Sequence, residues 1–169
     1  MNLDERLRHV QDLDLEPIKF KLVHDEDGPR WSITDTDRVE VEYKRFLALN
    51  LKNVTDKRVQ SIVPTREVDK FWHAHILDTM KYEADCAHCL GFFLHHFPYL
   101  GLRGPEDALA LQERFRESLE YYHAEFGQSG GVKETASDCD GSDCAPEPSC
   151  SGEPPPKITT RDRPVLVRA

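Results

Sequence analysis

Hydrophobic residues recur at steps of three and four along much of the chain, the spacing that places them on one face of an α-helix. Residues 3–13 have this spacing, and Asn2 with Glu5 fits the capping box that starts many helices. The same spacing predicts a second helix that begins near Thr34 and extends to roughly Leu51. The first third of the chain is therefore expected to contain two amphipathic helices.

Two further helices are predicted downstream. Pro64 and Thr65 introduce the third and longest, which should end near Gly91 because glycine commonly terminates helices. Pro105 occupies a first-turn position of the fourth, and Gly127 ends it. The apolar stripe of the fourth helix consists of Ala108, Leu111, Phe115, Leu119, Tyr122 and Phe126.

Between the first two helices the pattern changes to alternation. Ile18, Phe20 and Leu22 alternate with lysines, Asp27-Gly28 is typical of a hairpin turn, and Trp31 alternates with Ile33. This alternation predicts a short N-terminal β-ribbon. The expected fold class is mainly α, a small domain of about four helices with that ribbon.

The composition divides the chain of 169 residues into a helical domain over 1–128 and a tail over 129–169. The tail is acidic, rich in Gly, Ser and Pro, and poor in large apolar residues, so we expect it to be disordered. It carries Cys139, Cys144 and Cys150, which fit capture of a soft metal ion, a redox-responsive segment, or a solvated linker with incidental thiols. The tail is also a candidate binding arm for a protein partner.

A formal charge of −9 argues against nucleic-acid binding and against attraction to anionic membranes. The first residues lack the apolar stretch of a signal peptide, and no later run is long enough to span a bilayer. We therefore expect a cytoplasmic protein whose five cysteines are thiols, metal ligands or transient redox partners. The oligomeric state cannot be inferred from these features.

Residues 69–98 are the part of the chain richest in chemically active side chains. They contain five of the eight histidines and two of the five cysteines. Imidazole and thiolate bind transition metals, and imidazole transfers protons near neutral pH. This density makes a metal site or a catalytic site the leading hypothesis.

Helical geometry restricts which of these residues can share an ion. On one straight helix His75 and Cys86 lie roughly 16 Å apart along the axis, whereas a zinc ligand must approach to roughly 2.0–2.3 Å. Further ligands must therefore come from beyond Gly91, where His95 and His96 follow a predicted chain reversal. The pool of candidate ligands is His73, His75, Cys86, His95 and His96, for zinc or iron.

Two local pairs in this region are open to more than one interpretation. Asp69 and His73 are four residues apart on a helix, and such a pair can bind a metal or form an ion pair. Cys86 and Cys89 have the spacing of a redox dithiol, but they lie late in their helix, where a thiolate is disfavoured. Two buried small hydrophobic residues are the simpler interpretation of the cysteine pair.

The segment from Val68 to Thr79, continued by Tyr82, Gly91, Pro98 and Gly101, resembles the glycine-rich domain-containing protein-like family. The resemblance covers roughly residues 39–101 and implies a mostly helical domain without defining a substrate. The residues that match its motif positions are Trp72, His73, His75, Asp78, Tyr82, Asp85, Cys86, His95 and His96. The chain lacks the long glycine-rich region of the larger members.

Three hypotheses for function follow from the sequence. The first is a metal-binding helical domain, which would be an enzyme if the ion keeps an open position and Asp78, Tyr82 or Asp85 transfers protons. The second is a non-enzymatic interaction domain whose His, Tyr and Cys side chains form a buried packing network. The third is a metal-free acid–base enzyme, which only scattered carboxylates and histidines favour.

Overall fold

The computed structural model describes residues 1–25, 30–128 and 135. Within these ranges the regular structure is helical and contains no strand, which confirms the expected mainly α fold class. The elements are α1 (Leu3–Gln11), α2 (Glu16–Val23), α3 (Ile33–Asp56), α4 (Arg66–Leu77), α5 (Thr79–Asp85), the π-helical turn η1 (Cys86–Leu90) and α6 (Pro105–Phe126).

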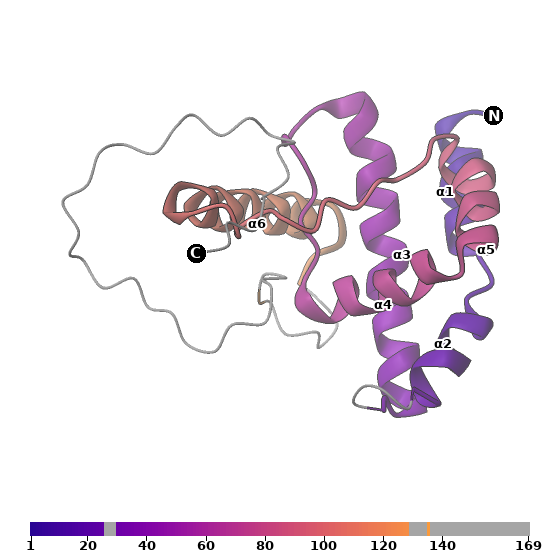
Figure 1. Cartoon of the computed structure of the whole chain (residues 1–169). Helices are drawn as coiled ribbons and strands as arrows, with labels where there is room; N and C mark the ends of the chain where they lie inside the picture. The colour runs from indigo at the N-terminus through magenta and orange to yellow at the C-terminus, as the bar shows by residue number, and fades with distance from the viewer. Residues whose placement is uncertain (26–29, 129–134, 136–169) are drawn as a thin grey trace.

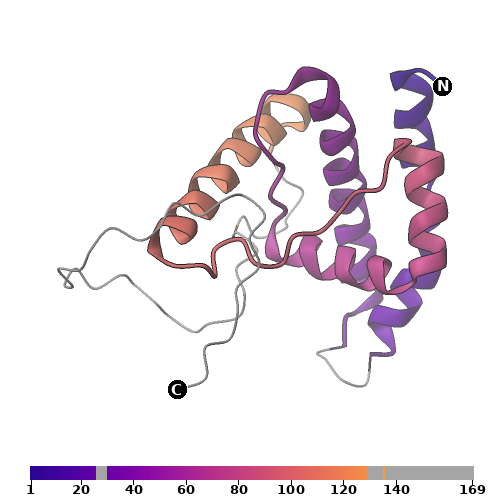
Figure 2. The ribbon, with the colours of Figure 1, turned by 45° about the horizontal axis from the view of Figure 1, so that its top comes forward.

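Helix α3 runs through the middle of the domain, and α1, α2 and α4 pack against it (Figure 1). A rotated view shows α1 beside α5 and η1 at one edge and α6 on the other side of α3 (Figure 2). The core lies among α1 to α5 and η1, and its fully buried side chains include Tyr43, Phe71 and Tyr82. Burial of each large apolar side chain stabilises the fold by about 1.5–3 kcal/mol.

The N-terminal capping box is present, because the Asn2 side chain accepts from the backbone of Glu5 and the Glu5 side chain accepts from the backbone of Asn2. The predicted β-ribbon that follows is wrong, since residues 16–23 form helix α2. Its buried residues Ile18 and Leu22 are four apart and face the core, whereas Phe20 is 66% exposed. The predicted turn at residues 27 and 28 lies outside the described residues.

The predicted third helix is divided into three parts. Thr65 caps α4 by accepting from the Val68 backbone, but α4 ends at Leu77, and the Asp78 side chain accepts from Lys81 at the start of α5. Helix α5 continues into η1, which ends at Gly91 as predicted. The longest described helix is consequently α3, with 24 residues.

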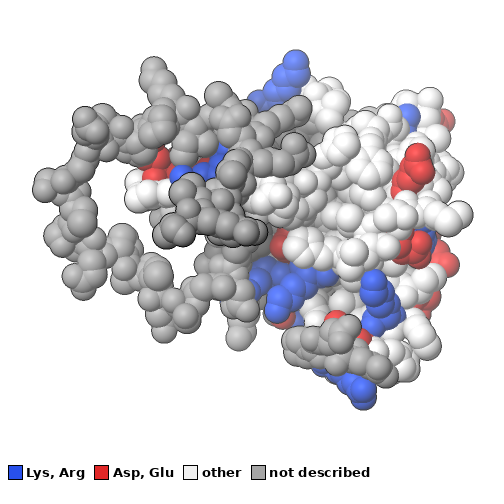
Figure 3. Space-filling model, in the orientation of Figure 1, with Lys and Arg blue, Asp and Glu red and all other residues white. Residues whose placement is uncertain are grey.

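Gly91 reverses the direction of the chain after η1. Its φ of 78° lies in the left-handed region that favours glycine. An added Cβ would also meet the Arg6 guanidinium, with the nearest atom at 2.3 Å. The following residues, 92–104, contain no helix and run across α4 to the start of α6 (Figures 1 and 2). Figure 3 shows a mostly uncharged surface over this segment.

Helix α6 keeps its predicted bounds, from Pro105 to a C-cap at Gly127. Several hydrogen bonds join it to α3. The Tyr122 hydroxyl donates to the Glu42 carboxylate and accepts from Arg45 at 2.8 Å, and the Tyr121 hydroxyl donates to Asp56 at 2.9 Å.

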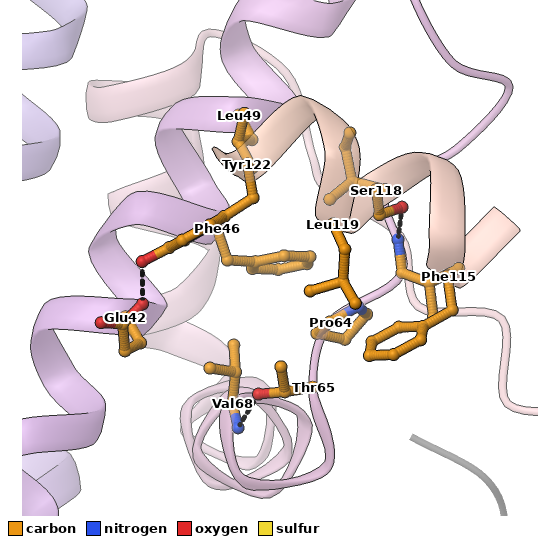
Figure 4. Close-up of a pocket in the computed structure, with 12 residues that line it drawn as sticks. Glu42, Phe46, Leu49, Pro64, Thr65, Val68, Phe115, Ser118, Leu119 and Tyr122 are labelled. Carbon is orange, nitrogen blue, oxygen red and sulfur yellow. Dashed lines mark hydrogen bonds between the residues drawn. The ribbon is translucent and has the colours of Figure 1, made fainter. Parts of the chain in front are cut away.

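A largely apolar pocket lies between α3, residues 62–65, the start of α4 and α6 (Figure 4). Phe46, Val68 and Leu119 point into it, and Glu42 and Tyr122 are joined by a hydrogen bond at its edge. Only part of the predicted apolar stripe of α6 is deeply buried. Leu111 is buried, whereas the four later members are half-buried, namely Phe115, Leu119, Tyr122 and Phe126.

Among the helices that the structure describes, none combines the length and the apolar character needed to cross a bilayer. The predicted disordered tail over 129–169, with Cys139, Cys144 and Cys150, lies outside the described residues apart from Thr135.

Candidate metal centre

Three side chains converge at the surface where residues 92–104 cross α4. The Nε2 atoms of His73 and His96 lie 3.0 Å apart. A carboxylate oxygen of Asp69 lies 3.2 Å from the His96 Nε2, and the other lies 3.4 Å from the His73 Nε2. Within the described part of the chain, this is the one group of three or more His, Cys, Asp or Glu side chains whose ligand atoms could hold an ion.

The backbone explains why the three side chains meet. Asp69 and His73 are four residues apart on α4, so they project from the same helical face. His96 arrives from the segment that follows the reversal at Gly91. The contact between His73 and His96 joins the third predicted helix to the His95-His96 turn, which the prediction of a shared site requires.

The site is open on one side. The His73 side chain is 50% exposed, whereas Asp69 and His96 are only 17% and 19% exposed. The two better buried groups therefore form the floor of the site, and His73 lies at its rim. A bound ion would be reachable from solvent.

No arrangement of imidazole protons turns all three contacts into favourable hydrogen bonds. A proton on the His96 Nε2 can be shared between Asp69 and the lone pair of the His73 Nε2, which forms both short hydrogen bonds. The His73 lone pair then lies 3.4 Å from the second carboxylate oxygen. A cation at the centre would accept all three lone pairs at once. The arrangement thus suits a bound cation and also a hydrogen-bonded His–His–Asp group.

The separations also suit metal coordination. Two ligand atoms on a tetrahedral ion bound at roughly 2.0–2.1 Å lie about 3.3 Å apart, and neighbouring ligands on an octahedral ion of similar size lie about 3.0 Å apart. The three observed contacts of 3.0, 3.2 and 3.4 Å cover that range. The ligand atoms are therefore close to the positions that an ion would require.

His75 lies in a different environment from His73. Its side chain is 1% exposed; the Tyr43 hydroxyl lies 2.8 Å from Nδ1 and an Asp85 oxygen lies 2.9 Å from Nε2. Burial lowers the pKa of His75, and this outweighs the opposing effect of Asp85. The neutral ring can then accept from Tyr43 and donate to Asp85, so both nitrogens have partners within the protein.

Tyr82 connects α4, α5 and the segment after Gly91. Its hydroxyl accepts from the Trp72 indole N–H at 2.9 Å and donates to the Leu94 carbonyl. Tyr82 is 1% exposed, and burial raises its pKa far above the usual tyrosine range. These contacts make it a structural residue of the core.

Both cysteines of this region are free thiols in the core. Burial raises the pKa of Cys89 to about 11, and its thiol donates to the His9 carbonyl. Burial also raises the pKa of Cys86, although hydrogen bonds with the Leu94 backbone and Tyr82 oppose that rise. The buried, protonated thiols agree with small hydrophobic residues and not with a redox dithiol.

The remaining predicted site residues lie outside the three-residue group. His95 is exposed and its ring packs against Phe93. Asp78 caps α5, and Asp85 accepts from His75 and pairs with Lys81 at 2.9 Å. The structure thus brings together His73 and His96 from the candidate pool and places His75, Cys86 and His95 apart from them.

Asp69 is the member of the group that the candidate pool omitted. Its spacing of four residues from His73 was the available signal, but the same spacing is typical of ordinary surface ion pairs. Only the position of His96, which depends on the chain reversal, separates the two interpretations.

A family model described as UCP032817-like matches residues 5–122. The match contains most of α1, all of α2 to α5 and η1, and most of α6, and so includes all three residues of the group. No curated protein and no solved structure gives a significant match. The glycine-rich domain-containing protein-like family, which the motif resembles, therefore stays a prediction.

Proposed function

We propose that this chain, which belongs to the UCP032817-like family, binds one divalent transition-metal ion through Asp69, His73 and His96. The observation that carries the proposal is the convergence of two imidazole nitrogens and a carboxylate within 3.0–3.4 Å of one another. We name this set the 69–73–96 triad.

The donor set limits the identity of the ion. Two imidazoles and one carboxylate suit zinc, as in catalytic zinc sites with three protein ligands, and ferrous iron, as in facial triads of two histidines and one carboxylate. Calcium and magnesium prefer oxygen ligands throughout, which disfavours them here. Zinc or iron is accordingly the proposed occupant.

Three protein ligands leave coordination positions for water or for another small ligand. Structural zinc sites usually have four protein ligands, so an open triad with an exposed His73 is more typical of a site with chemistry. Such an ion would lower the pKa of bound water and polarise a coordinated oxygen. Asp78, Tyr82 and Asp85 each have structural partners, so any proton transfer is more simply assigned to the metal-bound water.

The packing-network hypothesis is favoured for one part of the cluster. The chain of contacts from Tyr43 through His75 to Asp85 satisfies both nitrogens of a buried imidazole. His75 is therefore assigned to packing, and the 69–73–96 triad to metal binding. The two hypotheses from the sequence apply to different residues of the same helix. The tail over 129–169 keeps its proposed role as an arm for a protein partner.

The resemblance to the glycine-rich domain-containing protein-like family extends the proposal from this chain to other members of that family. His73 and His96 occupy motif positions of that resemblance, and Asp69 lies within the same continuous segment. If the relationship holds, members of that family should carry a comparable three-residue group.

Alanine substitution of the proposed ligands tests the function. Zinc affinity is measured by competition with a chromophoric chelator, using the full chain without an affinity tag. Loss of one of three ligands in His73→Ala or His96→Ala should weaken zinc binding by more than about 100-fold, beyond the range typical of outer-shell partners. Cys139, Cys144 and Cys150 are replaced by serine in every protein compared, so that their thiols do not contribute.

His95→Ala is the matched control, because His95 neighbours His96 but lies outside the triad. Its zinc affinity should stay within about threefold of the parent chain. The proposal would be overturned if the parent chain does not bind zinc or ferrous iron at micromolar concentration. An unchanged affinity in His96→Ala would also contradict it.

A further inference from the structure

Three successive contacts hold the segment that delivers His96 to the triad. The Phe93 ring packs edge-on against Tyr82 with centroids 5.2 Å apart, and the Leu94 carbonyl accepts from the Tyr82 hydroxyl. The His96 ring lies against Trp72, with centroids 4.7 Å apart. Two core residues thereby fix the segment at three positions.

The two core residues are also bonded to each other. The indole N–H of Trp72 donates to the Tyr82 hydroxyl at 2.9 Å, which leaves the hydroxyl proton for Leu94. Trp72 is 5% exposed and Tyr82 1% exposed, so this chain of hydrogen bonds is protected from water.

We infer that Trp72 and Tyr82 are positioning residues of the metal site, holding His96 beside Asp69 and His73 before an ion binds. The inference rests on the proposed function, since it concerns the ligand geometry of the 69–73–96 triad. Trp72 adjoins His73 on α4, and Tyr82 secures the backbone two residues before His96. The pair therefore links the two segments that supply ligands.

Positioning should raise zinc affinity because it reduces the conformational entropy that residues 92–97 lose when the ion binds. Residues 92–97 contain no helix or strand, so their own backbone does not impose one conformation. Without the Tyr82 hydrogen bond, His96 would sample positions away from the triad, and metal binding would have to order the segment. Preorganisation by a bond that does not touch the ion removes that cost, as outer-shell partners do in metal sites.

Tyr82→Phe tests the inference by removing one hydroxyl while keeping the buried ring. Zinc affinity should fall by about 10–100-fold, the range for loss of an outer-shell partner. Tyr43→Phe is the matched control, because Tyr43 is equally buried and its hydroxyl bonds to His75 instead of the His96 segment. Its zinc affinity should change by less than about threefold, and both are measured with Cys139, Cys144 and Cys150 replaced by serine.

Two further readouts separate positioning from general stability. Amide hydrogen exchange of residues 92–97 in the metal-free chain should accelerate in Tyr82→Phe and stay unchanged in Tyr43→Phe. The visible absorption of bound cobalt(II) should also change in Tyr82→Phe, because the His96 ligand is displaced. Trp72→Phe, which removes the N–H donor, is a second variant. It should also lower zinc affinity, accelerate exchange of residues 92–97 and change the cobalt(II) absorption.

The outcomes distinguish this inference from the proposed function. If the parent chain binds no zinc, the metal site itself fails, and the inference fails with it. If the parent chain binds zinc but Tyr82→Phe binds it equally well, only the positioning role is overturned. An equal loss of affinity in Tyr43→Phe and Tyr82→Phe would likewise assign the effect to the core as a whole.

Discussion

His73 and His75 stand two residues apart on α4 and have opposite surroundings. His73 is half exposed and faces a carboxylate and another imidazole, whereas His75 is 1% exposed and bonded on both nitrogens. Both imidazoles of the segment His73-Ala74-His75 are potential ligands, so the sequence alone does not show which of them belongs to a metal site. Their burial and partners assign one to the metal centre and the other to the core.

His75→Ala should therefore destabilise the domain without affecting the triad. The change leaves a cavity and removes the partners of the buried Tyr43 hydroxyl and of Asp85. We expect a loss of about 3–5 kcal/mol in the free energy of unfolding, from the combined cavity and unpaired polar groups. Urea unfolding in the presence of a chelator measures this free energy.

The exposed His95 supplies the control, since His95→Ala should change the free energy of unfolding by no more than about 0.5 kcal/mol. Where the His75→Ala domain remains folded, its zinc affinity should match that of the parent chain. A large loss of zinc affinity with unchanged stability would instead identify His75 as a ligand.

At the scale of single elements, the break between α4 and α5 is the main difference from the predicted third helix. The hydrophobic spacing continues through Asp78, so periodicity alone gives one long helix. Asp78 prefers a cap position because its short side chain can bond to the backbone of the next turn. This local competition ends α4 and redirects the chain into α5.

The β-ribbon prediction failed for a related reason. Ile18, Phe20 and Leu22 alternate with lysines, but Leu15, Ile18 and Leu22 also have helical spacing, and these three are buried. Over eight residues both periods fit, and packing of α2 against α3 and α4 decides between them. Short elements are thus the ones whose type the sequence leaves undetermined.

The reversal at Gly91 was predictable because its signal is local. Gly91→Ala should destabilise the domain by about 1–2 kcal/mol from the left-handed backbone alone, and further from the approach of Arg6. The control is Gly91→Ala in an Arg6→Ala background, which keeps the same backbone strain and removes the guanidinium. Thermal unfolding of both variants gives the comparison, and equal destabilisation would contradict a steric role for Arg6.

At the scale of the whole molecule, the candidate metal centre depends on tertiary contact between distant segments. The helical class, the capping box and the bounds of α6 follow from patterns within a few residues. The triad requires α4, the break at Asp78, the reversal at Gly91 and the Tyr82 contact with Leu94 together. The sequence therefore indicates which region holds the site, while the set of ligands becomes clear only from the fold.

Helix α6 lies on the other side of α3 from α1 (Figure 2), and the Tyr122 hydroxyl donates to Glu42 where α6 meets α3. The triad and the residues that position it belong to α4, α5 and the segment after η1. A metal ion would thus join the returning segment to α4.

X-ray absorption of the zinc-loaded, tag-free chain, with Cys139, Cys144 and Cys150 replaced by serine, tests the central claim most directly, because it reports the atoms around the ion. The account predicts one zinc per chain with nitrogen and oxygen ligands at roughly 2.0–2.1 Å and the multiple-scattering pattern of two imidazoles. Sulfur ligands at roughly 2.3 Å would place the ion on cysteines and contradict the account. Absence of any bound ion at stoichiometric zinc would contradict it equally.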